Sequence, residues 1–419
     1  MTTQKALRTT LLTTLFVLVA PTLWATPKYQ VLYGFTNGVD GGGLWSSVVF
    51  DTKGNLYGTT SGGGVYGYGT VFQLTPGQSG QWTENVIHNF PRDFKDGYEP
   101  FGGPAFGPDG NLYGATRYGG TRDLGAVYQV IRGPSGWAET VLYDIGDNPE
   151  DEINPSATLA IDETGNLFGT APNSGAVFEV SPGPTGWTES VLYNFCSKPQ
   201  CSDGYEPFSG LILDGKGSLY GTAEAGGNYP PACPVSGGCG VVFKVKPRPD
   251  GSWKYRVLHR FAAFKTDGVA ATGELVLDPA GSLYGATDQG GRYTCWGTMG
   301  CGTVYKLTPQ PNGHWKETIL HNFRQNKNGY NPSAGVVLDP AGNLYGTTGF
   351  GGGTCNCGVV YKLAPSPDGS WTYTVLHSFT GDDGASPAAN LIFDDQGNLY
   401  GTTVLGGPGG AGVVFEITP

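Results

Sequence analysis

The chain has 419 residues and a formal net charge of −11, with 71 glycines, 30 prolines and 12 % aromatic residues. An acidic surface repels phosphate backbones, so the charge argues against a nucleic-acid partner. So much glycine and proline approaches the level at which disorder is suspected, but the aromatic content and the regular return of glycine predict many short strands joined by tight turns.

The first 25 residues have the pattern of a secretory signal peptide. Lys5 and Arg8 precede the short apolar stretch "LLTTLFVLVAPTLWA", which ends at Ala25. Because this stretch is short and interrupted by Pro21, it does not predict a stable membrane span after processing. We expect residues 1–25 to be removed and residues 26–419 to form one exported domain, periplasmic or extracellular. A retained N-terminal anchor is the alternative.

The next segments read as strands. "KYQVLYGF" at 28–35 alternates apolar and polar residues, and four further strands are expected at 46–51, 55–60, 69–74 and 82–90. Glycine- and proline-rich turns separate these four, and no segment among them has helical spacing. Short strands in succession with tight turns predict an antiparallel meander.

One motif recurs along the rest of the chain. "GNLYGTT" at 54–60 returns in six related copies that start at 110, 165, 217, 281, 342 and 397, and the aromatic residue of the motif recurs every 52 to 64 residues. Four strands in a repeat of this length are typical of a propeller blade. A linear stack of sheets is the alternative, but it would leave two exposed ends.

The two ends of the repeat region favour a closed ring. The last repeat stops after its third strand, "GVVFEITP", whereas residues 28–35 match fourth strands such as "ENVIHNF" and "YTVLHSF". If the two segments pair, the exposed sheet edges disappear. The sequence therefore predicts an all-β, seven-bladed β-propeller of four-stranded antiparallel blades, closed by the N-terminal strand in the last blade.

Several repeated positions invite a chemical reading but are expected to be structural. Four of the five histidines occupy a slot in the fourth strand that other copies fill with tyrosine, so we expect a packing or hydrogen-bonding role: His88, His259, His321 and His377, with Tyr33, Tyr143 and Tyr193. A tryptophan opens the fourth strand in six repeats, and we expect it to pack on the neighbouring blade rather than to form a sugar platform.

Two further positions belong to the repeated turn and strand. An aspartate stands three residues before the turn glycine in six copies, for example Asp51, and Gly107 replaces it in the second copy. Such an aspartate caps turn amides, and one carboxylate per loop does not predict calcium. The mid-strand glycine, for example Gly58, indicates crowding, which we place near a shared axis.

The eight cysteines form four local pairs, as expected in an oxidising compartment. A direct bridge between the last two is strained by their spacing, so a cross-loop partner is left open there. The spacings lack CxxC and no histidine lies beside them, so no metal and no other cofactor are expected. The pairs are Cys196 with Cys201, Cys233 with Cys239, Cys295 with Cys301, and Cys355 with Cys357.

Candidate ligand contacts come from the most variable segments of the repeat. The loops between the second and third strands are longest in the fourth to sixth copies, where Tyr229, Tyr293 and Trp296 are candidate aromatic contacts. Loops that drift in length without a function are the alternative. The links between blades repeat an acid, and the candidates are Asp96, Asp203, Asp267 and Asp383; carboxylates can do acid–base work, but Asp-Gly is also a common turn.

The segments "DGYEPFGG…DGNLYGAT…GAVYQV" and "GASPAANLIFDDQGNLYGTT…GVVFEITP" resemble the GloVer tandem repeat of exported bacterial proteins. The resemblance covers nearly all of residues 26–419. It implies export and a repeated β architecture, and it brings no established reaction or catalytic residues. Similar proteins carry varied C-terminal anchors, and none is expected here, because the sequence ends within the final repeat.

Taken together, the sequence favours a secreted protein that binds a glycan, a peptide or an envelope component. No G-x-S-x-G, phosphate-loop or haem-attachment motif is present in the sequence. The alternative is an extracellular polysaccharide hydrolase or lyase with carboxylates in the central funnel. A propeller hosts both classes, so the choice between enzyme and binding protein stays open, as does the oligomeric state.

Overall fold

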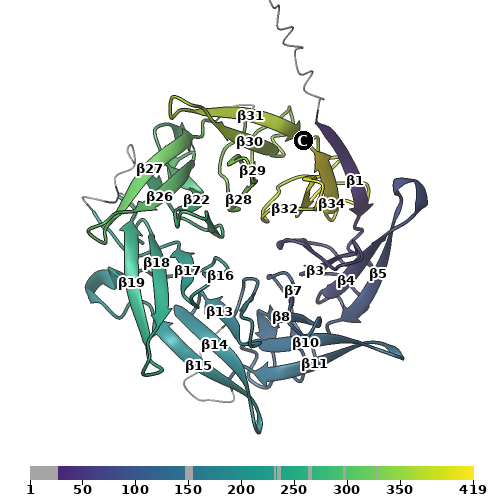
Figure 1. Ribbon diagram of the computed structural model, residues 1–419. Helices are drawn as coiled ribbons and strands as arrows, with labels where there is room; N and C mark the ends of the chain where they lie inside the picture. The colour runs from purple at the N-terminus through teal and green to yellow at the C-terminus, as the bar shows by residue number, and fades with distance from the viewer. Residues whose placement is uncertain are drawn as a thin grey trace, which may run out of the picture.

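A computed structural model describes residues 27–146, 154–230, 233, 237–262, 267–295, 299–325 and 328–419. Seven four-stranded antiparallel sheets are arranged as blades around a central opening (Figure 1). The predicted seven-bladed propeller is therefore confirmed. Among the described residues, no helix is long and apolar enough to span a membrane. The predicted signal peptide lies outside them.

Each blade runs outward from a short innermost strand to a long outer one. The strands of blades 1 to 3 are β2 (Val49–Phe50), β3 (Leu56–Thr60), β4 (Thr70–Pro76) and β5 (Trp82–Asn89); β7 (Ala105–Phe106), β8 (Leu112–Thr116), β10 (Ala126–Gly133) and β11 (Gly136–Asp144); and β12 (Ala160–Ile161), β13 (Leu167–Ala171), β14 (Ala176–Gly183) and β15 (Gly186–Asn194).

Blades 4 to 7 repeat the same order. Their strands are β16 (Ile212–Leu213), β17 (Leu219–Ala223), β18 (Val241–Pro247) and β19 (Trp253–Arg260); β21 (Val276–Leu277), β22 (Leu283–Thr287), β26 (Thr303–Pro309) and β27 (Trp315–Asn322); β28 (Val336–Leu338), β29 (Leu344–Thr348), β30 (Val359–Pro365) and β31 (Trp371–Ser378); and β32 (Ile392–Phe393), β33 (Leu399–Thr403), β34 (Val413–Thr418) and β1 (Lys28–Gly34).

Minor elements decorate the links and loops. Three two-residue pairs and two short 3-10 turns are described: β6 (Gly97–Tyr98) with β9 (Tyr118–Gly119), β20 (Gly268–Val269) with β23 (Gln289–Gly290), β24 (Thr294–Cys295) with β25 (Met299–Gly300), η1 (Gln78–Gly80) and η2 (Pro199–Cys201).

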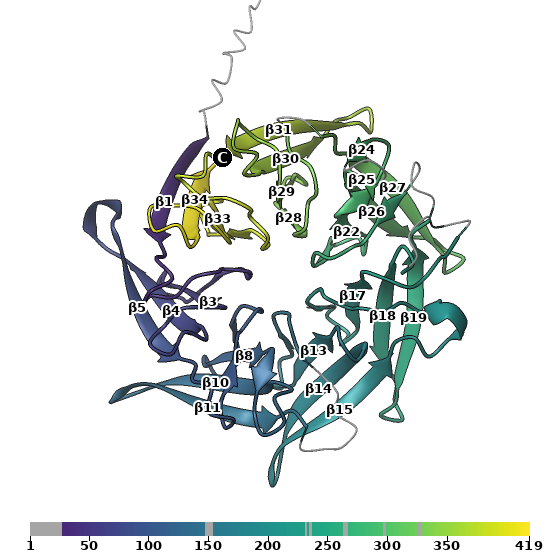
Figure 2. The ribbon, with the colours of Figure 1, turned by 180° about the vertical axis from the view of Figure 1, so that it is seen from behind.

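The ring closes in blade 7, as the sequence predicts. Strand β1 pairs antiparallel with β34, from Lys28 opposite Thr418 to Gly34 opposite Val413. Figures 1 and 2 show β1 in purple beside yellow β34, next to the C-terminus. Blade 7 is therefore a full four-stranded sheet built from both ends of the described chain, in the order β1-β34-β33-β32.

The successive residues of the repeated "YGTT" segment make different contacts. A side chain at Gly58 would overlap the ring of Phe72, the residue opposite it on β4. The glycine thus makes room for a buried aromatic residue of its own blade; the prediction of crowding is confirmed, but its placement at a shared axis is wrong. The next residue, Thr59, donates to the carbonyl of Gly102 in blade 2 at 2.9 Å and so joins two blades. Thr60 contacts the Thr70 hydroxyl at 2.9 Å.

The repeated turn aspartates cap their turns, as expected. Asp51 accepts hydrogen bonds from the backbone amides of Lys53 and Asn55 and from the Asn55 side chain, at 2.7 to 2.9 Å. In blade 2, Gly107 stands at the usual aspartate position, and Asp109 takes the place of that aspartate. Asp109 accepts a hydrogen bond from the Tyr113 hydroxyl at 2.8 Å. These hydrogen bonds lower the pKa of both aspartates.

The tryptophans that open the fourth strands pack on the preceding blade. Trp137 of blade 2 lies edge-on to Tyr57 of blade 1, with ring centroids 5.8 Å apart, and Trp253 of blade 4 lies 5.9 Å from Phe168 of blade 3. This confirms the packing interpretation. Each blade interface therefore contributes its own buried cluster to the core.

All four local cysteine pairs are disulfides. Cys355 and Cys357 bond directly to each other, so the cross-loop alternative is wrong. Three of the bridges fix a loop end that holds the next blade: the carbonyls of Cys239, Cys301 and Cys357 accept from the amides of Ala270, Asn331 and Ser386 at 2.9 to 3.2 Å. Closing each small loop stabilises the fold by ~2 kcal/mol in the chain-entropy model.

Candidate functional site

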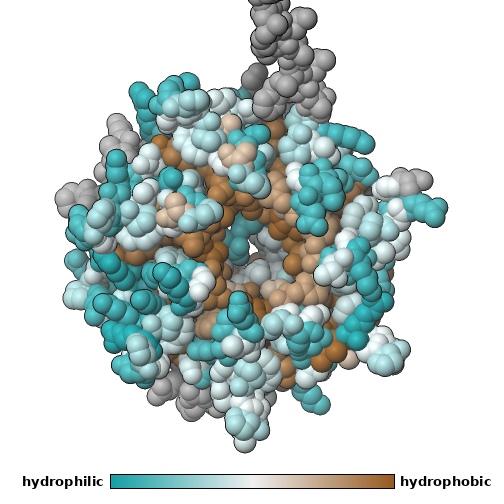
Figure 3. Space-filling model, viewed as in Figure 1, coloured by the Kyte–Doolittle hydropathy of each residue, from teal (hydrophilic) through white to brown (hydrophobic). Residues whose placement is uncertain are grey.

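A channel runs along the axis, and its wall changes character along its length. On one side the innermost strands line a cavity of about 470 Å³ with apolar residues such as Val49, Val276, Val337 and Ile392. Figure 3 shows hydrophobic residues, in brown, around the central opening. On the other side, where the links between blades run and which we call the link side, the wall becomes polar. A smaller cavity of about 110 Å³ there, the channel mouth, is lined by Ser, Thr, Asn and Glu side chains and three aromatic residues.

Glu274 is one of the residues that line both cavities. It follows the link into blade 5, and its carboxylate accepts a hydrogen bond of 2.7 Å from Asn390 of blade 7. A side chain at Gly210 would overlap the Glu274 carboxylate, so this glycine makes room for the acid. Burial raises the pKa of Glu274, although the Asn390 amide opposes the shift.

Aromatic side chains form part of the rim on the link side. Trp45 is 46 % and Phe208 37 % exposed, and both line the small cavity together with Phe101. The rings of Trp45 and Phe101 lie 6.0 Å apart, and the guanidinium of Arg117 lies 5.2 Å from the Phe101 ring. Because large hydrophobic side chains are rarely left exposed around a concave surface without a role, this rim is a candidate contact surface.

Three acidic residues lie near one another at blades 4 and 5, outside the lining of the axial cavities. Glu224 directly follows β17, and its amide binds the carbonyl of Glu206 in the adjacent link at 3.0 Å. Burial and the nearby charges of Glu206 and Asp288 raise the pKa of Glu224 to about 7. Asp288 is held by the Ser333 hydroxyl at 3.1 Å, and burial raises its pKa. These three carboxyls therefore form a group separate from the residues that line the small cavity.

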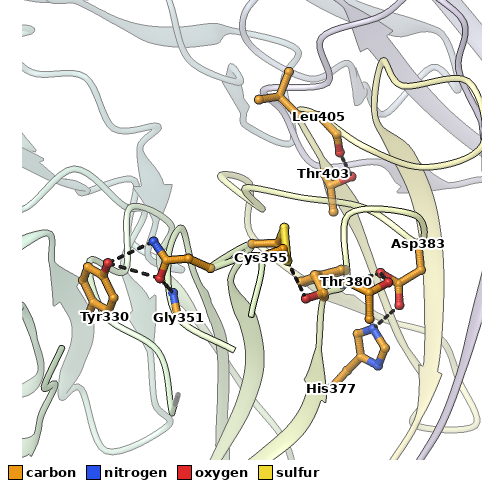
Figure 4. Close-up of a disulfide and its surroundings, with 11 residues drawn as sticks. Tyr330, Gly351, Cys355, His377, Thr380, Asp383, Thr403 and Leu405 are labelled. Atoms are coloured by element: carbon orange, nitrogen blue, oxygen red, sulfur yellow. Dashed lines mark hydrogen bonds and ion pairs between the residues drawn. A yellow bond between two sulfur atoms is a disulfide. The ribbon is translucent and has the colours of Figure 1, made fainter. Parts of the chain in front are cut away.

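The link aspartates proposed as ligand contacts lie between blades. Their carboxylates bond to the shared His/Tyr slot: Asp96 to His88 at 3.0 Å, Asp203 to Tyr193 at 2.5 Å, Asp267 to His259 at 3.2 Å and Asp383 to His377 at 2.9 Å. Figure 4 shows the last pair, with Asp383 also holding Thr380 beside the loop of Cys355. They are not brought together at the axis, and their role as ligand contacts stays a prediction.

Two of the aromatic residues predicted from the long loops, Tyr229 and Tyr293, belong to the described part of the chain. Tyr293 is 36 % exposed, and the guanidinium of Arg324 lies 5.4 Å from its ring. Tyr229 is half-buried, and its carbonyl accepts from the amide of Cys233 at 3.1 Å. Trp296 lies outside the described residues. Neither Tyr229 nor Tyr293 lines the small axial cavity.

Sequence reasoning missed the residues at the mouth itself. Glu274 stands four residues before the turn aspartate, where the other repeats have Ser47, Gly103, Thr158, Gly210, Gly335 and Asn390. A column-by-column comparison of the seven links would have shown one carboxylate among small and neutral residues. The same comparison two residues earlier would have separated Trp45, Phe101 and Phe208 from the smaller side chains of the other copies.

These features define a closed seven-bladed propeller with a polar, partly aromatic channel mouth on its link side. The chain belongs to the family of the Gloeobacter/Verrucomicrobia repeat, which matches residues 14–230 and 293–419. The predicted resemblance is thereby confirmed. None of the curated proteins compared with the chain matches it.

Solved structures share the fold at low sequence identity. PorZ, a surface component of the type-IX secretion system of Porphyromonas gingivalis, is 15 % identical with a TM-score of 0.52, over 90 % of this chain but 46 % of PorZ. A candidate 6-phosphogluconolactonase from Bacteroides uniformis is 13 % identical with a TM-score of 0.50, over 85 % of this chain and 89 % of that chain. At such identities the likeness shows the fold alone.

Proposed function

We propose that the protein is an exported binding propeller that takes a glycan at the channel mouth on its link side. The supporting observation is the pairing of exposed aromatic rings, Trp45 and Phe208, with a polar cavity that contains Glu274 and Asn390. Sugar rings stack on aromatic faces, and their hydroxyls need both donors and acceptors. An amide and a carboxylate side by side supply both.

Export is supported by the chemistry of the fold and by the pattern of the first 25 residues. Four disulfides are expected to persist only in an oxidising compartment. The periplasm and the extracellular space both satisfy this condition. A peptide or another envelope component is the competing ligand class, and it would use the same aromatic rim.

A glycan array probed with the full chain tests the proposal, followed by calorimetric titration of the best ligand. Trp45→Ala should weaken binding about 10-fold or more, because one aromatic contact is worth about 1–3 kcal/mol in a well-packed site. Tyr293→Ala, a partly exposed aromatic residue away from the axial cavity, is the matched control and should leave affinity unchanged. Binding to peptides but to no glycan, or equal affinity for Trp45→Ala, would overturn the proposal.

One observation favours the enzyme alternative. Glycoside hydrolysis needs a carboxylic acid that stays protonated near neutral pH beside an ionised carboxylate, and Glu224 has a pKa raised to about 7 beside Glu206 and Asp288. A turnover screen on the polysaccharides that the protein recognises on the array distinguishes the two functions. Product formation that is lost in Glu224→Gln, with binding retained, would identify a hydrolase or lyase.

A further inference from the structure

Every described blade interface reuses one slot, and two of the interfaces fill it with a set of metal-ligating groups. The fourth strand of one blade offers His or Tyr, the following link offers a polar residue, either an acid or, in the link after His321, Asn328, and the fourth strand of the next blade offers a third side chain. Between blades 1 and 2 the set is His88, Asp96 and Glu139. Between blades 4 and 5 it is His259, Asp267 and Glu317.

The geometry of both sets suits a small divalent cation. The ligand atoms of each set all lie within 4.8 Å of one another. Nε2 of His259 is 3.2 Å from the Asp267 carboxylate and 3.8 Å from Oε1 of Glu317, and Nε2 of His88 is 3.0 Å from Asp96. Ligands around a tetrahedral zinc ion at Zn–N and Zn–O distances of 2.0–2.2 Å are separated by about 3.3 Å, so small movements of the side chains would complete the arrangement.

Each set contains two carboxyl groups, and the histidine is the one positively chargeable partner recorded for them in the described part of the chain. Oε1 of Glu139 and Oε1 of Glu317 are buried and accept no hydrogen bond from the described part of the chain. Each glutamate faces the aspartate of its own set, with the ligand atoms within 4.8 Å of one another. Two facing carboxyls in a poorly solvated place require a shared proton or a cation.

A second residue type accompanies the two sets. Tyr128 and Tyr305 are fully buried, and their hydroxyls have no hydrogen-bond partner among the described residues. Each lies near the two carboxyls of its set. At the matching position, blades 1, 3, 4 and 7 have phenylalanine, and blade 6 has Tyr361. The tyrosine thus supports the two sites without defining them.

The other interfaces show what the slot becomes without this set. Tyr255 stacks on Tyr193 with ring centroids 3.7 Å apart, Tyr373 on His321 at 4.3 Å, and Tyr29 on His377 at 3.7 Å. The ring of the third residue occupies the place where an ion would sit. At the interface of blades 7 and 1, Glu84 is present, but Tyr33 replaces the histidine.

We propose that the protein binds two divalent transition-metal ions, zinc or a similar ion, at the blade interfaces formed by His88, Asp96 and Glu139 and by His259, Asp267 and Glu317. One imidazole and two carboxylates are a donor set that zinc accepts, with water as a fourth ligand. Each ion joins two neighbouring blades and the link between them, so it cross-links the ring. The proposal does not depend on the ligand at the channel mouth.

The test is a metal titration of the full chain, without a polyhistidine tag and stripped with chelator. Equilibrium dialysis against ZnCl₂ at pH 7.5, followed by elemental analysis, should give two zinc ions per chain. Glu139→Gln and Glu317→Gln should each bind one, and the double variant none. Zinc should raise the melting temperature of the parent chain by several degrees and leave that of the double variant unchanged.

Glu84→Gln is the matched control, because it removes the equivalent glutamate at an interface without histidine, and it should still bind two ions. Circular dichroism confirms that each variant is folded, and Co²⁺ absorption of the parent chain gives a readout that needs no variant. No bound zinc and no cobalt absorption band would overturn the proposal, since the facing carboxyls would then share a proton. Two ions retained by the double variant would also overturn it.

Discussion

The interface between blades 4 and 5 and the interface between blades 6 and 7 begin with the same two side chains. His259 contacts Asp267 at 3.2 Å in one, and His377 contacts Asp383 at 2.9 Å in the other. The next blade then supplies Glu317 in the first case and Tyr29 in the second. Tyr29 stacks on the imidazole and donates to the Asp383 carbonyl at 2.5 Å, whereas Glu317 adds a second buried carboxyl.

The same backbone therefore allows two kinds of contact between neighbouring blades. We call the contact through stacked rings the stacked joint and the contact through facing carboxyls the carboxyl joint. A stacked ring pair is neutral and needs neither a shared proton nor an ion. Burial lowers the pKa of His377, so the stacked pair should keep its strength at neutral and alkaline pH and weaken only as the pH falls below the ordinary imidazole pKa. A pair of facing carboxyls is destabilising when both are ionised, so its strength depends on what neutralises it. The seven blades are thus held together by some contacts that depend on the neutralisation of facing carboxyls and by others that do not.

The largest expected effect comes from removing β1, because this strand serves two joints. It carries Tyr29, which packs on blade 6, and Tyr33, which lies beside Asp40 and Glu84. Deleting residues 26–35 should expose an edge of β34 and remove most of the ~5–15 kcal/mol that stabilises a typical domain. Thermal unfolding and light scattering measure this. A folded, monomeric product with the parent melting temperature would refute ring closure by β1.

The stacked joint can be broken alone. Tyr29→Ala should lower the free energy of unfolding by about 2–4 kcal/mol, because it removes a large ring packed between His377 and Phe415. Gln30→Ala, on the same strand, is the control and should change stability by less than about 0.5 kcal/mol. A double-mutant cycle with His377→Ala should show a coupling of about 0.5–1.5 kcal/mol; additive effects would deny the stacking contribution.

The contact through facing carboxyls should make the stability of the fold depend on pH. Burial and the charge of Asp40 raise the pKa of Glu84 from 4.5 to about 7, so the folded protein holds this proton more tightly than the unfolded chain. Its contribution to stability is complete below pH 4.5 and is lost as the pH rises to about 7. Glu84→Gln should therefore be more stable than the parent chain at pH 8, by about 1–2 kcal/mol after allowing for partial solvation.

The readout for Glu84→Gln is the difference between melting temperatures at pH 5 and pH 8, which should be smaller in the variant than in the parent chain. Glu163→Gln, in an exposed turn, is the control and should leave that difference unchanged. If the Glu84→Gln profile runs parallel to that of the parent chain, the glutamate is not responsible for the pH dependence.

The smallest effect tests the acid in the link. Burial lowers the pKa of His321 to about 4, and the link beside it has Asn328 where the link after His259 has Asp267. Asn328→Asp should raise the pKa of His321 by about one unit or more, because an opposite charge favours the imidazolium, with a stability change below about 1 kcal/mol. NMR titration of the imidazole measures it, and Asp383→Asn should have the reverse effect on His377.

The sequence predicts the repeat architecture well, because each blade restates the same local rules. The turn aspartate, the glycine opposite Phe72 and the tryptophan at the start of β5 each have a cause within one or two blades. Even ring closure follows from matching residues 28–35 to the other fourth strands. The innermost strands were predicted too long: residues 46–51 were expected, and only Val49–Phe50 pair as a strand.

The candidate site is predicted less well, because it depends on contacts between blades that are far apart in sequence. Glu274 meets Asn390 across 116 positions, and no local pattern announces the pair. The long loops drew attention to Tyr229 and Tyr293, yet the mouth is lined by short link segments near the axis. The link acids were correctly seen as a repeated feature, but their partners, the fourth-strand histidines and tyrosines, become clear only in three dimensions.

The pairing of Lys28 with Thr418 fixes the order of events when the chain folds from one end. Blades 1 to 6 each have all their strands within a stretch of about 50 residues, whereas blade 7 must wait until β34 has emerged. Until then, the first strand has no partner and the unfinished ring exposes an edge at each end, a state prone to misassembly. Any truncation near residue 413 should therefore be felt at both ends of the polypeptide at once.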